Sequence, residues 1–342
     1  MKELLPQITA WAHLGKPFAL ARVIQTWGSS PRPVGSALII SDDGEMAGSV
    51  SGGCVEGAVV KEAKNVLAQQ MGKRLAFGVS DDEAWSVGLT CGGKVQVYLQ
   101  PFPTGQSQEG DVWHALIQSL NDNKSGVLVT TLIDGVTTSS FLSMEGTMLG
   151  PALPEELLVK AREAFSKRVH ESVAIGEAQY FIHVFPRKSQ LLIIGAAHIT
   201  ADLVQLAHLH DFETTVIDPR GAFADRTQFV QAPDQIVVKY PSEVLDQYPL
   251  DANSYAVILS HDPKIDDDAL KILLRSKVAY IGALGSRKTH DKRITRLIQA
   301  GFSEEDIKRI EAPIGVDINA LGAKEIALSI MASVIKAKNE YL

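Results

Sequence analysis

The stretch IIGAAHITA, which surrounds Gly195, combines a glycine turn with the start of a predicted helix. A strand, a glycine turn and a helix leave backbone amides free at the helix N-terminus, where phosphate and other anions bind. Gly195 stands at the first glycine of the dinucleotide pattern G-x-G-x-x-G, but Ala197 and Thr200 replace the later glycines. The pattern therefore predicts an anion site, with a ligand-free turn as the alternative. We assign to this site Gly195, Ala196, Ala197 and His198.

A carboxylate follows the helix that begins there. Asp218 ends the next apolar strand, ETTVID, and Arg220 comes two residues later. A carboxylate in this position of a dinucleotide fold accepts hydrogen bonds from ribose or other vicinal hydroxyls. We assign both residues to the predicted site. In the alternative interpretation Asp218 only begins a turn at Pro219.

Two more polar loops follow predicted strands in the same half of the chain. Ser260, His261 and Asp262 follow the strand YAVIL, and the strand VAYIGAL leads into a second loop made of Gly285, Ser286, Arg287 and Lys288. Open α/β sheets bind ligands at the carboxyl ends of their strands, and basic residues beside free amides bind phosphate. We expect the three loops to converge on one anionic ligand, with His261 donating to it or moving a proton. The alternatives are helix caps and a plain surface cluster of basic residues, and the acids at 266–268 are expected in a solvated first helical turn.

The stretch AGSVSGGCVEGAVV raises the question of a reactive thiol. Ser51, Gly52 and Gly53 precede Cys54 just before a predicted helix. Loop amides can bind an anion, and a helix N-terminus favours the thiolate form of cysteine. We therefore assign these four residues to the candidate site, with a tight turn and a small buried cysteine as the alternative. Cys91, before another pair of glycines, has no assigned role, and GSSPRPVG offers a further anion site or a rigid turn.

Composition restricts the class of protein. The chain has 342 residues, a net charge of −7 and two cysteines. The negative charge argues against broad binding to nucleic acid or anionic membranes. Two cysteines argue against a disulfide scaffold and favour a cytoplasmic location. The sequence contains neither a CxxC pair nor an HExxH motif, which argues against a structural zinc site. The sequence has no apolar run near the roughly 20 residues that span a bilayer.

The residue pattern predicts two domains of different kinds. Residues 1–187 mix short strands, hairpins and helices, as in an α+β domain. Residues 188–342 alternate short apolar strands with amphipathic helices, beginning with a strand–helix–strand unit. That alternation predicts a parallel sheet covered on both faces, a Rossmann-like doubly wound fold. The fold class is therefore α/β overall, with a boundary near residue 187.

Seven stretches, in this order, resemble the XdhC/CoxI family, the accessory factors of xanthine dehydrogenase and related molybdenum hydroxylases. They are GSSPRPVGSALII, GSVSGGCVEGAVV, GLTCGGKVQVYLQP, LLIIGAAHITADLVQLAHLHDFETTVIDPR, LSHDPKIDDDAL, YIGALGSRKTHDKR and APIGVDINALGAKEIALSIMASV. The resemblance covers nearly the whole chain from about residue 20 to about residue 335. It implies an N-terminal XdhC/CoxI domain and a C-terminal Rossmann-like domain.

The resemblance also implies a function. Members bind the molybdenum cofactor (molybdopterin), hold it while its terminal sulfur is installed, and insert it into an apo molybdenum hydroxylase. A cysteine desulfurase supplies the sulfur, and the family suggests a homodimer. The pterin phosphate is expected on the three C-terminal loops, with Cys54 near the molybdenum or in sulfur transfer. Such a protein is a maturation chaperone rather than a catalyst.

Two other functions stay open from the sequence. The first is an NAD(P)-dependent oxidoreductase that uses the C-terminal domain and Asp218. The incomplete glycine pattern, with Ala197 where relatives often have glycine, argues against it. The second is an enzyme that modifies the cofactor or its sulfur through Cys54.

Overall fold

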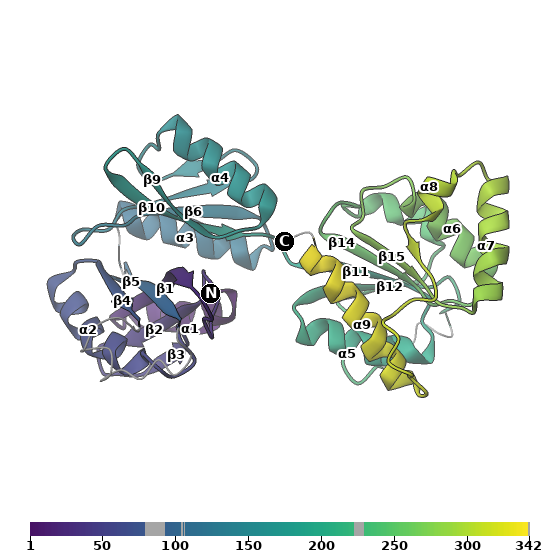
Figure 1. Cartoon of the computed structure of the whole chain (residues 1–342), viewed down its shortest axis with the longest axis horizontal. Coiled ribbons are helices and arrows are strands. Elements are labelled where there is room, and N and C mark those ends of the chain that lie inside the picture. The colour runs from purple at the N-terminus through teal and green to yellow at the C-terminus, as the bar shows by residue number, and fades with distance from the viewer. Residues whose placement is uncertain (79–92, 104, 106, 222–228, 341–342) are drawn as a thin grey trace. The chain divides into compact units, whose positions relative to one another are not determined.

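The computed structural model describes residues 1–78, 93–103, 105, 107–221 and 229–340. The chain divides into two compact units, the N-terminal unit Met1–Arg187 and the C-terminal unit Lys188–Leu342 (Figure 1). The N-terminal unit contains two antiparallel sheets and the C-terminal unit one parallel sheet.

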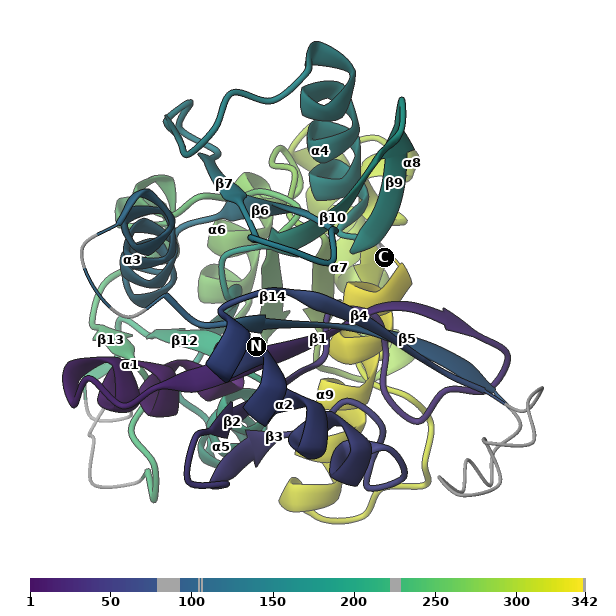
Figure 2. The same cartoon turned by 90° about the vertical axis from the view of Figure 1, so that its left-hand side faces the viewer.

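The first sheet of the N-terminal unit has the strand order β3-β2-β1-β5-β4, and all its neighbours are antiparallel. Its strands are β1 (Phe18–Trp27), β2 (Ala37–Ser41), β3 (Met46–Gly48), β4 (Lys73–Phe77) and β5 (Lys94–Pro101). Helix α2 (Glu56–Gln69) covers one face, because Val59, Ala63 and Val66 lie on one side of the helix and bury against the sheet (Figure 2). The turn pair Asp43-Gly44, which stands between two apolar runs, lies in the hairpin connection between β2 and β3.

The second sheet of this unit has the order β8-β7-β6-β10-β9 and is also antiparallel. Its strands are β6 (Gly126–Thr131), β7 (Ser139–Ser143), β8 (Met148–Leu149), β9 (Glu171–Ile175) and β10 (Ala178–Phe185). Helix α4 (Glu155–Lys167) buries Leu157 and Ala161 against one face. Helices α1 (Leu5–His13) and α3 (Gln108–Asn121) share a core with residues of both sheets, so they pack between the two (Figure 1).

The C-terminal unit is built on six parallel strands in the order β13-β12-β11-β14-β15-β16. They are β11 (Ser189–Ile194), β12 (Phe212–Ile217), β13 (Gln235–Val237), β14 (Ser254–Ile258), β15 (Tyr280–Ala283) and β16 (Ile310–Glu311). Every residue of β11 and β14 is buried, as expected of central strands with both faces covered. The predicted parallel sheet and the α/β fold class are therefore confirmed.

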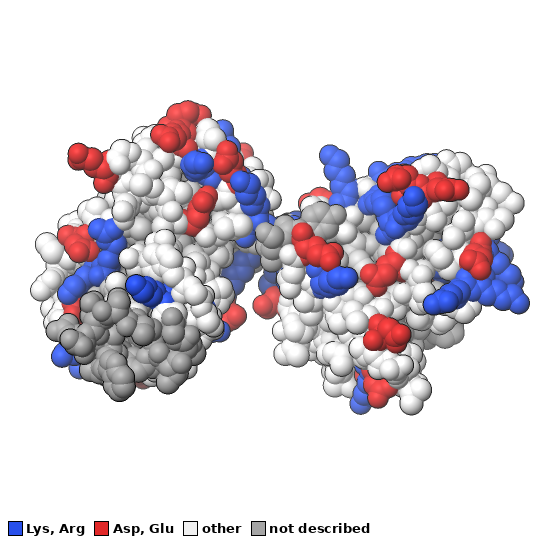
Figure 3. Space-filling model, in the orientation of Figure 1, with Lys and Arg blue, Asp and Glu red and all other residues white. Residues whose placement is uncertain are grey.

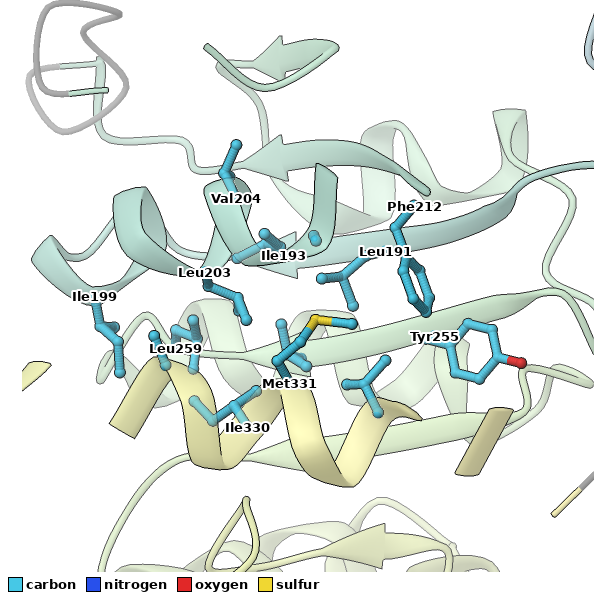
Figure 4. Packing of buried hydrophobic residues seen from close by; sticks show 14 of the residues in the cluster. Leu191, Ile193, Ile199, Leu203, Val204, Phe212, Tyr255, Leu259, Ile330 and Met331 are labelled. Atoms are coloured by element: carbon cyan, nitrogen blue, oxygen red, sulfur yellow. The ribbon is translucent and has the colours of Figure 1, made fainter. Parts of the chain in front are cut away.

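Helices cover both faces of this sheet. Helices α5 (His198–Leu209) and α9 (Ala323–Glu340) pack on one face and contact each other. Figure 4 shows Leu203 of α5 and Ile330 and Met331 of α9 among the apolar side chains of that face. The opposite face is covered by α6 (Pro263–Leu273), α7 (Arg287–Gln299) and α8 (Glu304–Ile307).

The surface has no single dominant charge on the face drawn in Figure 3, where acidic and basic side chains intermingle over both units. No helix among the described residues has the length and apolar character needed to cross a membrane. Within the same part of the chain, no group of three or more His, Cys, Asp and Glu side chains is placed to hold a metal ion.

Candidate anion site at the carboxyl edge of the parallel sheet

Three of the predicted loops lie along one edge of the C-terminal sheet. Strands β11, β14 and β15 are parallel neighbours, so their carboxyl ends meet at the same edge. The amide of Leu259 donates to the carbonyl oxygen of Ile194 at 2.7 Å, which continues the pairing to the end of the strands. The structure therefore brings together the predicted loops 195–198, 260–262 and 285–288.

The glycine at the first turn is required by its neighbour. Gly195 has a φ of +107°, and a Cβ added to it would lie 2.5 Å from both the Cα and the backbone nitrogen of Ser260. The Thr200 hydroxyl donates a hydrogen bond of 2.8 Å to the Gly195 carbonyl oxygen. Gly195 therefore lets the loop after β11 pack directly on the loop after β14.

Exposed basic side chains and helix N-termini line this edge. His198, His261, Arg287 and Lys288 are all exposed. Helix α5 has no side-chain cap, whereas Asp262 caps α6 and Ser286 caps α7. Caps are thus the structural role of those two side chains, while the four basic residues face solvent. This combination of positive charge and amides suits an anionic ligand.

Asp218 is not open to a ribose as expected from its position in the sequence. The side chain is fully buried. One carboxylate oxygen accepts from the Ala196 amide at 2.8 Å and from Arg220 Nη2 at 2.9 Å. The other accepts from the Arg220 amide and from Arg220 Nε, both at 2.9 Å. Burial acts to raise the pKa of Asp218, but the hydrogen bonds from Arg220 and Ala196 outweigh it and the pKa is lowered.

A buried ion pair beneath these loops was missed by the sequence analysis. Asp266 accepts from the Ser260 hydroxyl at 2.5 Å and from Arg293 Nη2 at 3.2 Å. Arg293 also donates to the carbonyl oxygen of Leu284 at 3.0 Å, so the pair connects the loops after β14 and β15. Burial raises the pKa of the Asp266 carboxyl despite both partners.

The expectation of a solvated acidic turn at 266–268 is therefore wrong for Asp266, which is 5% exposed. The signal was present in the sequence. Asp266 shares its helical face with Ala269, Leu270 and Leu273, which are three, four and seven residues further along and are buried. An acid on the apolar stripe of a helix needs a buried partner, and Arg293 supplies it.

Two family models match this chain, one in each unit. The model of the XdhC and CoxI family matches residues 11–78, and the model of the XdhC Rossmann domain matches residues 191–334. The chain belongs to the XdhC and CoxI family. All three loops at the carboxyl edge lie inside its Rossmann domain.

Two curated relatives and one solved structure align with nearly the whole chain. A Bacillus subtilis (strain 168) protein, named as a probable subunit of xanthine dehydrogenase, is 25% identical over 93% of this chain and 92% of its own. The molybdenum cofactor insertion chaperone PaoD of Escherichia coli (strain K12) is 24% identical, over 95% of this chain and 84% of its own. A Bacillus halodurans structure described as a xanthine dehydrogenase has a TM-score of 0.79 and 26% identity, covering 99% of this chain and 96% of that one.

The backbone amides of the serine-glycine-cysteine stretch, in the XdhC and CoxI domain, donate hydrogen bonds to a nearby carboxylate, that of Glu56. Glu56 accepts hydrogen bonds from the amides of Val50, Ser51 and Gly53 at 2.9–3.1 Å. It also accepts from the hydroxyls of Ser49 and Ser51. The Gly52 amide donates to the Ser49 hydroxyl at 2.8 Å. The structure therefore differs from the open anion cradle expected at residues 51–53, because the loop amides already have acceptors.

Cys54 lies two residues before the first residue of α2. It is a free thiol, partly buried, and it packs against the apolar cluster between α2 and the first sheet. Cys91 lies outside the described residues. The position of Cys54 agrees with a small hydrophobic side chain beside a helix start, and its assignment to sulfur transfer stays a prediction.

A polar group inside the N-terminal unit of this XdhC and CoxI protein also escaped the sequence analysis. Arg22, in the apolar strand FALARVIQTW, is fully buried. Its Nη2 donates to Gln100 at 2.6 Å and to Thr130 at 3.0 Å, and its guanidinium lies over the rings of Trp113 and Phe181. Burial lowers the pKa of Arg22 to about 10. The sequence signal for this buried group was an arginine within an otherwise apolar predicted strand.

Acid is expected to destabilise the N-terminal unit through a histidine pair near Arg22. The rings of His170 and His183 are 4.7 Å apart. Burial lowers the pKa of His170 from 6.5 to about 4 and that of His183 well below 6.5. The unfolded chain therefore binds more protons than the folded one between pH 6.5 and 4. We expect the free energy of unfolding to fall across that window, by about 3 kcal/mol for His170.

Urea unfolding at several pH values measures this effect. The variant His170→Gln should reduce the loss of stability between pH 7 and pH 4.5, whatever its effect at neutral pH, while the part due to His183 remains. His114→Gln, which replaces an exposed histidine on α3, is the control and should keep the full dependence. An unchanged slope in His170→Gln contradicts the assignment.

Proposed function

We propose that this protein binds the molybdenum cofactor, holds it while its terminal sulfur is installed, and inserts it into an apo molybdenum hydroxylase. The carrying observation is a basic, amide-rich edge of the Rossmann sheet in a chain whose relative PaoD is named a molybdenum cofactor insertion chaperone. The pterin of that cofactor bears a phosphate, and this edge supplies the donors that a phosphate needs. Xanthine dehydrogenase or a related hydroxylase is the proposed recipient, in line with the name of the Bacillus subtilis relative.

The predicted site residues of the C-terminal unit have different parts in this proposal. Residues 195–198 contribute the N-terminus of α5, with His198 at its start. His261, Arg287 and Lys288 contribute positive charge or hydrogen-bond donors from the neighbouring loops. Side chains that are buried or engaged in caps, namely Asp218, Ser260, Asp262 and Ser286, hold these loops in place.

Several further features belong to the same proposal. Residues 1–187 form the XdhC/CoxI domain and residues 188–342 the Rossmann domain. A cysteine desulfurase is the proposed sulfur donor, the assembly is a homodimer, and the location is the cytoplasm. An NAD(P)-dependent oxidoreductase is the weaker candidate, because the carboxylate that would bind ribose already accepts four hydrogen bonds.

Retention of the cofactor tests the proposal. Purified protein is mixed with released cofactor, passed through a desalting column, and assayed for bound molybdenum and pterin. We expect retention by the wild type and a loss of about tenfold or more in the double variant Arg287→Ala/Lys288→Ala, since two charged contacts disappear. The double variant Lys271→Ala/Lys336→Ala removes the same charge from exposed positions elsewhere and should retain the cofactor. Retention no better than that of an unrelated protein would refute the proposal.

The role of Cys54 needs a separate experiment. Cys54→Ser should retain the cofactor but deliver it without activating the recipient hydroxylase, if the thiol takes part in sulfur transfer. Equal hydroxylase activity after maturation by Cys54→Ser and by wild type would remove Cys54 from the mechanism. It would also remove the alternative of an enzyme that modifies the cofactor through this thiol.

A further inference from the structure

The carboxylate at the end of β12 has no capacity left for another ligand. A carboxylate offers about four lone-pair sites for hydrogen bonds. Asp218 uses two on each oxygen, with donors from the Ala196 amide, the Arg220 amide, Arg220 Nε and Arg220 Nη2. All four donors belong to the same unit of the chain. A ribose could therefore bind Asp218 only after a present donor has left.

The two side-chain donors take the place that a diol needs. In dinucleotide-binding folds the carboxylate at this strand end accepts the ribose hydroxyls. Here the guanidinium of Arg220 spans both oxygens of Asp218, with Nε on one and Nη2 on the other. Such charge-assisted, bidentate bonds are stronger than bonds from neutral hydroxyls. Because Asp218 is fully buried and the Arg220 side chain is 33% exposed, a ribose arriving from solvent meets the guanidinium first.

We propose that Arg220 is a specificity-determining residue that closes the Rossmann domain to ligands carrying a ribose diol. The residue acts by occupying Asp218, in a fold whose architecture otherwise suits a dinucleotide. A ligand that presents only an anionic group to the edge does not need Asp218 and is not excluded. This inference concerns ligands with a ribose diol and does not rest on the proposed function.

Two alternatives to the proposed role of Arg220 can be tested separately. The methyl group of Ala197, at the second glycine position, could itself keep a pyrophosphate away. Ala197 has an extended backbone with a φ of −70°, so glycine is not required there for conformation. A free arginine near this position can also bind a ribose 2′-phosphate. Here the charge of Arg220 is paired with Asp218 at 2.9 Å, so a 2′-phosphate would meet a neutral pair.

Calorimetric titration with ADP-ribose, NADH and 2′-phospho-ADP-ribose decides between these explanations. We expect no binding to the wild type at millimolar ligand. Arg220→Ala should bind ADP-ribose and NADH with dissociation constants roughly ten- to a hundredfold below the millimolar limit set by the wild type. The reason is that two acceptor sites of a charged group become available. Arg220→Lys keeps a positive charge near Asp218 but not the fork, so it should show a smaller gain.

The control variants make each outcome informative. Arg296→Ala breaks a similar bidentate pair, with Asp267, in the same unit, and its side chain is 34% exposed. It should gain nothing. Thermal unfolding checks that each variant is folded. If Arg220→Ala does not fold, the titration of Arg220→Lys tests the inference. A further variant, Ala197→Gly, tests the methyl group at the second glycine position. Binding of any probe by the wild type, a gain in Ala197→Gly but in no Arg220 variant, or no gain in a folded Arg220 variant would overturn the inference.

Discussion

Replacing Glu56 with alanine is expected to lower the free energy of unfolding of the N-terminal unit by about 3–5 kcal/mol. Glu56 accepts five hydrogen bonds from the loop at residues 49–53 and is 9% exposed. Its removal leaves the buried amides of Val50 and Ser51 without acceptors, and each such amide costs about 1–3 kcal/mol. The loss should therefore exceed that of an ordinary surface substitution.

Tryptophan fluorescence during urea unfolding measures this change selectively. All four tryptophans, Trp11, Trp27, Trp85 and Trp113, belong to the N-terminal unit. The control is Glu62→Ala on the same helix, which removes a partly exposed pair with Lys73 and should cost less than about 1 kcal/mol. If both variants lose the same small amount, Glu56 does not organise the loop.

The lowered pKa of Glu56 predicts a second loss of stability in acid. Burial acts to raise the pKa of Glu56, but hydrogen bonds from Ser49 and Ser51 lower it from 4.5 to about 2. Its contribution to stability is therefore present above pH 4.5 and is lost as the pH falls toward 2. This window begins at the lower end of the His170 window, and the two overlap between pH 4.5 and about 4.

Asp266→Ala is expected to destabilise the C-terminal unit by about 3–5 kcal/mol. The substitution leaves the Arg293 guanidinium at 1% exposure with the Leu284 carbonyl oxygen as an acceptor but no charged partner from Asp266. It also removes the carboxylate that accepts from both Ser260 and Arg293, so the loops after β14 and β15 lose this link. Breaking one side of a buried pair is costly because the remaining charge stays out of water.

Circular dichroism at 222 nm, recorded together with tryptophan fluorescence, tests this. The dichroism transition of the C-terminal unit should move to lower urea, while the fluorescence transition stays fixed. The double variant Asp266→Leu/Arg293→Met should recover much of the loss, because an apolar pair carries no stranded charge. Asp267→Ala, which breaks the more exposed pair with Arg296, is the control and should cost about 1 kcal/mol or less. Equal losses in Asp266→Ala and Asp267→Ala would contradict a special role for the buried pair.

Much of the fold could be predicted from local patterns. Continuous apolar runs such as QLLII indicate buried parallel strands, and Asp43-Gly44 between apolar runs indicates a hairpin. Both features depend on residues that are close in sequence, and both are confirmed. The convergence of loops 195–198, 260–262 and 285–288 could be predicted from the parallel sheet, because parallel neighbouring strands place their carboxyl ends at the same edge.

The sequence by itself determined the order of elements, the parallel sheet and the family motifs, because hydrophobic periodicity and turn chemistry are local properties. Only the tertiary structure decided which polar groups remain available to a ligand. Glu56 fills the loop at residues 49–53, Arg220 occupies Asp218, and Asp266 is buried against Arg293. Residue type does not settle such pairings, because the partner of a carboxylate depends on how the packed backbone directs each side chain and how much water it excludes.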